Sequence, residues 1–315
     1  MGAILLVGCG NIGFRHLQAI CDVPAATDIV VVEPAVEHHA RIESQFVAGA
    51  APGRRFELHT RLPTDPAEFD VGVVATTAEP RREIVEEIFD HHRLGAIVLE
   101  KVVAQTRSDL EVIGARIDHA GAVGFVNCGR RTFDGYRKIA AEIAPETEVT
   151  VTVRGNEFGL ASNAIHFVDL AEFLSGTPTD AVDARGLERA AAPGKRPGTV
   201  ELYGRITGRL ARGGSFSIES GHGAATEIEV TIETPTTTWV VDEIGRVVTA
   251  EGSGPEPFAS QNVSESDEVY RDLLDHLDCS LTPYGDSRRQ HELVIDAVRD
   301  HLGISIERDD PCPIS

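Results

Sequence analysis

Short apolar runs alternate with helical patterns through the first 125 or so residues of the chain. The apolar and β-branched runs are too short for helices, and they predict strands at residues 3–7, 29–33, 71–75, 97–99 and 123–127. Between them, apolar residues recur with a helical period, which predicts helices at residues 12–21, 36–48, 81–92 and 108–119. This alternation is typical of a doubly wound α/β fold, in which helices cover both faces of a parallel sheet.

The pattern changes in the second half of the chain. Strict alternation of apolar and polar residues predicts strands at residues 148–154, 199–210, 227–233, 238–242 and 247–250, with one helix inserted at 163–174. Two acidic helical stretches, residues 267–279 and 286–301, end the sequence. We therefore expect two domains: a doubly wound domain at residues 1–125, and at residues 126–315 an α/β domain with an open, mostly antiparallel sheet.

Composition and charge exclude several classes of protein. The 315 residues are 42% apolar and 25% charged, which fits two globular cores and argues against wholesale disorder. A net charge of −21 without a Lys/Arg cluster argues against nucleic acid as a partner. No apolar run approaches the roughly 20 residues that a membrane span needs. No basic segment precedes the apolar run at residues 3–7, so we expect no signal peptide.

The five cysteines are odd in number and scattered, without a CxxC pair. This usage indicates a reducing compartment, and we expect a cytoplasmic protein without a disulfide framework or a zinc site. No cluster of His, Cys and Asp has the spacing of metal ligands, so we expect no metal.

The strongest chemical signal is a glycine-rich turn between the first predicted strand and the first predicted helix. It reads Gly8, Cys9, Gly10, Asn11, Ile12 and Gly13. In a dinucleotide-binding turn the first glycine permits the tight turn, the second lets the backbone approach a pyrophosphate, and the third allows close helix packing. Three such glycines alone are a weak match.

Glu33 strengthens this interpretation, because it ends the second predicted strand 20 residues beyond Gly13. An acid at this place binds the ribose hydroxyls of the cofactor and repels a 2′-phosphate. The sequence therefore favours NAD over NADP, and the flanking Pro34 and Ala35 add no cation for a phosphate.

Two further pairs end strands at the carboxyl edge of the predicted sheet, where ligands of open sheets lie. Thr76 and Thr77 contact a ligand there or cap the helix that follows. Glu100 and Lys101 end the next strand, and Lys101 is one of only three lysines among 29 basic residues. A partly desolvated lysine can exchange a proton, whereas arginine stays protonated. The alternative is a solvated edge charge.

His166 and Asp169 lie three residues apart on the inserted helix and share one of its faces. A lone histidine on such a helix is structural about as often as it is functional.

Together these motifs resemble the Gfo/Idh/MocA family, the relatives of glucose–fructose oxidoreductase and inositol dehydrogenase. They occur in the family's order over essentially the whole chain, and residues 126–131 with Tyr136 also resemble the segment after its nucleotide-binding domain. The resemblance implies an N-terminal Rossmann domain and NAD(P)-dependent hydride transfer at a carbon of a sugar, polyol or nucleotide sugar.

The resemblance also implies roles for residues. Lys101 corresponds to the lysine of the family's Glu-Lys-Pro motif, and His166 to its catalytic histidine, with Asp169 as its neighbour. The implied cofactor residues are Gly8, Gly10, Asn11, Ile12, Gly13, Glu33, Thr76, Thr77, Glu100 and Lys101; the implied substrate residues are Asn127, Arg130, Arg131, Ser162 and Asn163.

The chain departs from the family pattern at three positions. Val102 replaces the usual Pro, Arg81 stands where a His is frequent, and Ser162 replaces an Asp four residues before the histidine. The last change keeps a second interpretation open: a non-catalytic NAD-binding sensor or regulatory subunit. Arg130 and Arg131 bind an anionic group or are surface charges near the domain junction.

The second domain's sheet presents a broad outer face on which we expect apolar residues such as Trp239 and Val241 among polar ones. A face of this kind favours closed symmetric association, and we expect a homodimer or homotetramer.

Overall fold

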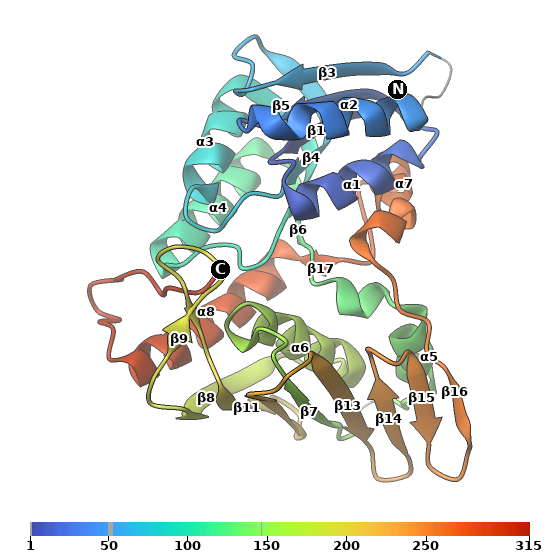
Figure 1. Cartoon of the computed structure of the whole chain (residues 1–315), viewed down its shortest axis with the longest axis vertical. Coiled ribbons are helices and arrows are strands. Elements are labelled where there is room, and N and C mark those ends of the chain that lie inside the picture. The colour runs from blue at the N-terminus through green and yellow to red at the C-terminus, as the bar shows by residue number, and fades with distance from the viewer. Residues whose placement is uncertain (1, 50–52, 146) are drawn as a thin grey trace. The chain divides into compact units, whose positions relative to one another are not determined.

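A computed structural model describes residues 2–49, 53–145 and 147–315, and these form two compact units (Figure 1). The first unit comprises the described residues of Met1–Ala104, Ser108–Asn127 and Gln261–Gly285; the second comprises Gln105–Arg107, the described residues of Cys128–Ser260, and Asp286–Ser315. The sequence division at residue 125 omits the return of Gln261–Gly285 to the first unit. That return follows from packing, because α7 (Asp267–His276) contributes the buried Val269, Tyr270 and Leu273 to the first core.

The first sheet has the strand order β3-β2-β1-β4-β5-β6-β17 in the described part of the chain. Its strands are β1 Gly2–Val7, β2 Ala26–Val32, β3 Arg55–His59, β4 Ala67–Val74, β5 His92–Leu99, β6 Val123–Val126 and β17 Thr282–Pro283. All pairs are parallel except β17 with β6. The order 3-2-1-4-5-6 is that of a dinucleotide-binding sheet, and the direction of winding reverses between β1 and β4.

Helices cover both faces of this sheet, as the βαβ alternation predicts (Figure 1). They are α1 Asn11–Cys21, η1 Val36–His38, α2 His39–Ala48, α3 Arg81–His91, α4 Arg107–Ala120, η3 Val263–Glu265 and α7. The core contains the β1 residues Ile4 and Leu6, and α1 adds Leu17 and Ile20.

The second sheet has the order β16-β15-β14-β13-β7-β12-β11-β8 among the described residues. Its strands are β7 Thr150–Asn156, β8 Thr179–Leu187, β11 Gly204–Leu210, β12 Ser215–Gly221, β13 Glu227–Glu233, β14 Thr238–Asp242, β15 Val247–Ala250 and β16 Pro255–Pro257. Among the strands that the structure describes in this sheet, only β7 and β12 pair in parallel. The predicted fold class is confirmed: an α/β chain with a doubly wound parallel sheet and a second, mostly antiparallel sheet.

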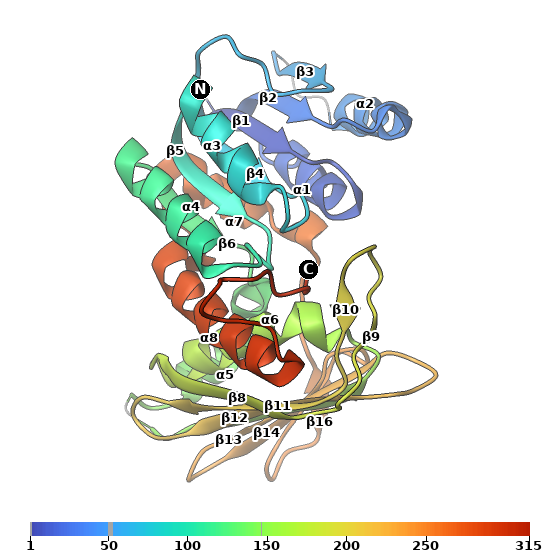
Figure 2. The ribbon, with the colours of Figure 1, turned by 90° about the vertical axis from the view of Figure 1, so that its left-hand side faces the viewer.

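One side of the second sheet carries helices (Figure 2). The helical segments of this unit are η2 Gly129–Thr132, α5 Asp134–Glu142, α6 Leu160–Ser175 and α8 Tyr284–Leu302. α6 is buried over most of its length and packs on β7, β11 and β12. The sequence pattern located this helix, although α6 begins three residues before the predicted start at residue 163.

The expected strand at residues 199–210 is wrong, because the structure divides it. Val200–Glu201 (β10) pairs with Ala192–Pro193 (β9) in a separate ladder, and β11 begins at Gly204. Gly204 has a φ of +99°, and a Cβ there would lie 2.6 Å from the Gly186 carbonyl oxygen. The chain therefore turns at a glycine that the alternation alone does not reveal.

The expected outward position of Trp239 and Val241 is also wrong. Both lie on the buried side of β14, with 5% and 0% of their surfaces exposed. The outer side of this strand carries Thr238, Val240 and Asp242 instead. Successive residues of a strand point to opposite faces of the sheet. The strand therefore turns its bulkier apolar residues, Trp239 and Val241, toward the core.

Within the described residues, no helix is long and apolar enough to cross a membrane. The same residues hold no group of three or more His, Cys, Asp or Glu side chains placed to hold a metal ion.

Candidate active site

The glycine-rich loop joins the end of β1 to the start of α1. Gly8 has a φ of +84°, and a Cβ on it would lie 2.9 Å from Cγ2 of Thr76. A Cβ on Gly13 would lie 1.9 Å from the Gly8 carbonyl oxygen, so only glycine lets α1 approach the loop this closely. A Cβ on Gly10 would meet no atom within 4 Å. The three glycines therefore serve the turn, the open approach and the packing that the sequence motif predicts.

The open space at Gly10 lies where α1 begins. Gly10 is the N-cap residue of α1 and has no side chain to cap the helix, and the first turn carries no acidic residue. The backbone N–H groups at the start of a helix bind anions, and Asn11 and Ile12 belong to this first turn. The geometry fits a pyrophosphate at this place.

Glu33 is buried, with 6% of its surface exposed, and follows the end of β2. Its Oε2 accepts a hydrogen bond from the Cys9 backbone N–H at 2.6 Å, and its Oε1 accepts one from the Ala35 N–H at 2.8 Å. The structure thus brings Glu33 to the glycine-rich loop and gives it a second task, which is to hold the backbone of that loop. Burial, followed by the charge of Glu33, raises the pKa of the Cys9 thiol to about 12, so this thiol stays protonated.

The sequence around Glu33 does not indicate Arg41, which lies beyond the immediate neighbours of Glu33. This residue lies in the first turn of α2, and its guanidinium donates to the carbonyl oxygens of Cys9 and Gly10, each at 3.3 Å. The guanidinium also lies 4.2 Å from the ring centre of Phe14. A cation therefore stands over the loop. The signal that could have found it is the position of Arg41 in the helix after the acidic strand end, since that helix starts at the carboxyl edge of the sheet.

Thr76 and Thr77 follow the end of β4, beside the glycine-rich loop. The hydroxyl of Thr76 donates to the Thr77 carbonyl oxygen at 3.2 Å. Neither threonine caps α3, because that helix begins at Arg81 with Pro80 as its N-cap residue. The helix-cap alternative is therefore wrong.

Glu100 follows the end of β5 and is buried, with 7% of its surface exposed. Its Oε1 accepts hydrogen bonds from His16 Nε2 at 2.8 Å and from Asn127 Nδ2 at 2.6 Å. The other ring nitrogen of His16 contacts the hydroxyl of Tyr270. Burial alone would raise the pKa of Glu100, but the hydrogen bonds from His16 and Asn127 and the charge of Lys101 hold it below its usual range. Glu100 is therefore a carboxylate at neutral pH.

Asn127, which the resemblance places among the substrate residues, thus lies in the first unit as a partner of Glu100. Lys101 comes directly after Glu100 and is half-buried. All the predicted cofactor residues lie in this unit, at the carboxyl ends of β1, β2, β4 and β5.

The second unit holds His166 and Asp169, which α6 places one turn apart. Asp169 is fully buried, and its two oxygens accept hydrogen bonds from Arg131 Nε at 3.0 Å and Gln290 Nε2 at 3.3 Å. His166 is half-buried. Glu172, one turn further along α6, accepts from Gln290 and from Arg289, at 2.9 and 2.6 Å. The acidic side of α6 is thus fixed by donors from η2 and α8.

Arg130 is neither a free anion receptor nor a surface charge. Its guanidinium binds both oxygens of Glu243, at 2.8 and 2.7 Å, and lies 3.9 Å from the ring centre of Phe167. Tyr136 donates to the same carboxylate at 2.7 Å. Burial disfavours the charged form of Arg130, but Glu243 outweighs it and raises its pKa. Arg131 is paired with Asp169. Both arginines therefore bind carboxylates of this chain, which corrects the two alternatives from the sequence, an anion-binding site or surface charges.

Ser162 and Asn163 lie in the first turn of α6. The Ser162 hydroxyl donates to the Gly159 carbonyl oxygen at 3.3 Å, and the Asn163 amide donates to the Phe158 carbonyl oxygen. Both side chains are half-buried, and both bind the loop that enters the helix.

No family model matches the sequence, and no curated protein matches it. Solved structures do match. The fold is shared. UDP-N-acetylglucosamine 3-dehydrogenase GnnA from Acidithiobacillus ferrooxidans is 13% identical with a TM-score of 0.68, over 96% of this chain and 99% of that chain. Biliverdin reductase from Synechocystis, in complex with biliverdin and NADP+, is 14% identical with a TM-score of 0.73, over 96% and 99%.

An oxidoreductase from Agrobacterium radiobacter, in complex with NAD+, L-tartaric acid and magnesium, is 18% identical with a TM-score of 0.63, over 97% of this chain and 98% of that chain. These structures therefore share the fold of this chain over at least 96% of its length.

Gly13 and Gly10 form a matched pair for a test of the loop. We expect Gly13→Ala to lower the thermal midpoint clearly, because its Cβ would meet the Gly8 carbonyl oxygen and the loop would have to shift. Gly10→Ala should leave the midpoint within about 2 °C of wild type, since it meets open space and a surface change costs little. Differential scanning calorimetry of the ligand-free proteins measures both, and equal midpoints for the two variants would contradict the packing role of Gly13.

Proposed function

We propose that the chain is an NAD(P)-dependent oxidoreductase of the Gfo/Idh/MocA family, acting at a carbon of a sugar, polyol or nucleotide sugar. The observation that carries the proposal is the gathering of Gly8, Gly10, Gly13, Glu33, Thr76 and Lys101 at one edge of a sheet with dinucleotide-binding order. The named relatives support the class of reaction: they include a nucleotide-sugar dehydrogenase and oxidoreductases bound to NAD+ or NADP+. We also propose a cytoplasmic location, because the five cysteines are odd in number and scattered along the sequence.

The residues that would hold the cofactor are those of the first unit. The N–H groups of Asn11 and Ile12 would face its pyrophosphate, and Glu33 would accept hydrogen bonds from its ribose hydroxyls through the lone pairs left beside Cys9 and Ala35. When bound, a nicotinamide cofactor supplies or accepts the hydride.

Lys101 carries the proton chemistry in this proposal. A hydroxyl that becomes a carbonyl must lose its proton, and the Nζ of Lys101 accepts that proton or polarises the oxygen. We propose His166, on α6, as a second candidate for proton transfer. Asp169 lies one turn from His166 on α6, and its carboxylate accepts hydrogen bonds from Arg131 and Gln290.

We infer a preference for NAD over NADP from the buried carboxylate of Glu33. NAD+ should bind at least about ten-fold more tightly than NADP+ in calorimetry, about 1.4 kcal/mol, because a 2′-phosphate would approach this carboxylate. Arg41→Ala should weaken both cofactors to a similar extent, since its guanidinium donates to the carbonyl oxygens of Cys9 and Gly10 in the loop that both cofactors would use. Equal affinities in the wild type, or a loss confined to NADP+ in Arg41→Ala, would contradict the assignment.

Lys101→Ala should lower single-turnover hydride transfer by roughly 10²–10⁴-fold while NAD+ binding persists. Lys101→Arg should restore little, because a guanidinium keeps its proton. His166→Asn should cost a similar factor, and the double variant should lose less than the product of the two if they act together. The substrate comes from a panel of sugars, polyols and nucleotide sugars followed by NADH absorbance. The exposed Lys138→Ala is the control.

A Lys101→Ala variant with the wild-type rate would show that this lysine is only an edge charge. Tight NAD+ binding without turnover on any member of the panel would favour the sensor or regulatory subunit, which the change to Ser162 leaves open.

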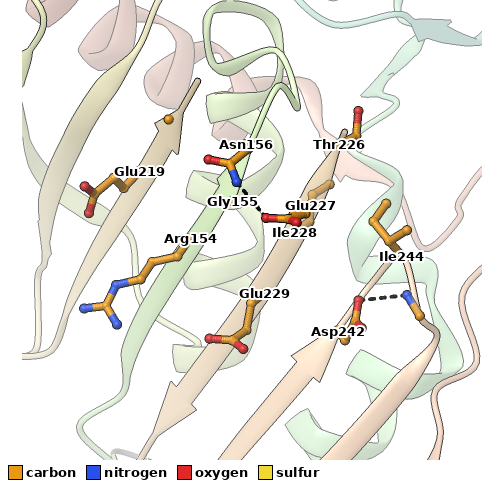
Figure 3. A pocket seen from close by; sticks show the side chains of 12 residues that line it. Arg154, Gly155, Asn156, Glu219, Thr226, Glu227, Ile228, Glu229, Asp242 and Ile244 are labelled. Atoms are coloured by element: carbon orange, nitrogen blue, oxygen red, sulfur yellow. Dashed lines mark hydrogen bonds between the residues drawn. The ribbon is translucent and has the colours of Figure 1, made fainter. Parts of the chain in front are cut away.

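We also propose that copies of the chain associate through the outer side of the second sheet. A row of exposed charges crosses it in the register Arg205, Glu219, Arg154, Glu229 and Asp242, and Figure 3 shows the hollow that Arg154, Glu219 and Glu229 line. The signs alternate over the first four positions, so a two-fold related copy can place opposite charges against them.

Light scattering at micromolar concentration should therefore give the mass of a dimer or tetramer. Arg154→Glu should shift it toward the monomer, because the row would then lose its central cation, whereas Arg93→Glu, exposed in the first unit, should not. A monomer mass for the wild type, in salt matched to the source, would refute the proposal.

A further inference from the structure

Arg81 is a cation with only 1% of its surface exposed, at the first position of α3. Its Nη1 donates to the carbonyl oxygens of Glu100 at 2.6 Å and Val103 at 2.9 Å, and also to that of Val102. Its Nη2 donates to the carbonyl oxygen of Thr76. A buried charge is tolerated where dipoles of this kind compensate it, and here they come from the ends of two neighbouring strands.

These four carbonyl groups belong to two segments that the proposed function uses. One is the loop at Thr76, and the other is the turn of residues 100–103, which carries Lys101. Glu100 and Val102 flank Lys101, so one guanidinium nitrogen holds the backbone on both sides of that residue. Val102 and Val103 are buried, whereas Lys101 is half-buried. The backbone of the turn is thus fixed by Arg81, while the Lys101 side chain stays partly exposed.

The fourth carbonyl group links this turn to the glycine-rich loop. Thr76 lies so close to Gly8 that a Cβ there would be 2.9 Å from the Thr76 Cγ2 atom. Gly8, Thr76, Arg81 and the Lys101 turn therefore form one continuous path of contacts. Arginine suits this task, because its planar fork donates in several fixed directions at once.

We propose that Arg81 is a positioning residue that couples the cofactor loop at Thr76 to the turn that carries Lys101, so that cofactor binding orders that turn. The inference rests on the proposed function, since it requires NAD(P) to bind beside Gly8 and Thr76. It also accounts for Val102: with Arg81 holding its carbonyl group, the turn does not depend on a proline at that position.

Amide hydrogen exchange of the full chain, with and without saturating NAD+, tests the coupling without a substrate. In the wild type, NAD+ should slow exchange roughly ten-fold or more both at residues 8–13 and at residues 100–104. In Arg81→Met, NAD+ should still protect residues 8–13, but residues 100–104 should exchange rapidly and respond to NAD+ by less than about two-fold. Protection at residues 8–13 without a response at residues 100–104 would show that the link is lost while the fold is kept.

Two further variants make the result specific. Arg82→Met removes the neighbouring arginine, which is partly exposed and pairs with Glu86 and Asp109, and it should behave as wild type. Arg81→Lys keeps the charge but lacks the planar fork, so it should restore part of the response at residues 100–104. If Arg81→Met does not fold, as judged by circular dichroism, the Arg81→Lys response decides.

The outcomes separate the two proposals. NAD+-dependent protection at residues 100–104 that persists in Arg81→Met, or a full wild-type response in Arg81→Lys where Arg81→Met does not fold, would overturn the coupling and leave the function intact. An absence of protection at residues 8–13 in the wild type would refute the proposed function, and with it the role of Arg81.

Discussion

The first unit depends on the donors that stabilise one buried carboxylate, that of Glu100. Glu100 lies at the end of β5 and carries a charge that has to be met by donors from other elements. His16 comes from α1, one turn after the glycine-rich loop, and Asn127 comes from the end of β6. Tyr270 on α7 contacts His16 and brings the returning segment into the same network. Because each donor that is lost would leave the buried carboxylate less compensated, the loop, the Lys101 turn and the return are held as a group.

Much of the candidate site could be predicted from the sequence, for a reason of topology. The carboxyl ends of parallel strands meet at one edge of a sheet, so residues that follow each strand are brought together whatever their separation along the chain. Gly8, Glu33, Thr76 and Lys101 each follow a strand that the apolar pattern locates. Their grouping therefore needs only the strand ends and the order of the sheet. The spacing of the three glycines adds the shape of the loop.

What the sequence could not show depends on contacts between residues far apart in it. Nothing local indicates that α7 returns to the first unit, since its apolar face fits either core. The pairing of Arg130 with Glu243 joins positions 113 residues apart, so the sequence left its charge unassigned. The sequence also does not show what the side chains of Arg41 and Arg81 bind, because their contacts depend on the direction of each side chain. Gly204 divides a strand because of a close approach to Gly186, which alternation does not record.

The chain uses arginine and lysine for different tasks, and this difference explains both the buried arginines and the position of Lys101. Arginine cannot give up its proton, but its fork binds several acceptors in fixed directions, and this suits a structural charge. Arg81 and Arg299 follow this rule: both are buried and both donate to backbone carbonyl groups, Arg299 to that of Gln105 at 3.2 Å. The sequence has three lysines, and of these Lys101 alone follows the end of a strand of the first sheet. The chain thus builds its fixed charges from arginine. It places Lys101 between the carbonyl groups of Glu100 and Val102, which Arg81 holds. The charge that holds the site is therefore a different one from the charge that is able to exchange a proton.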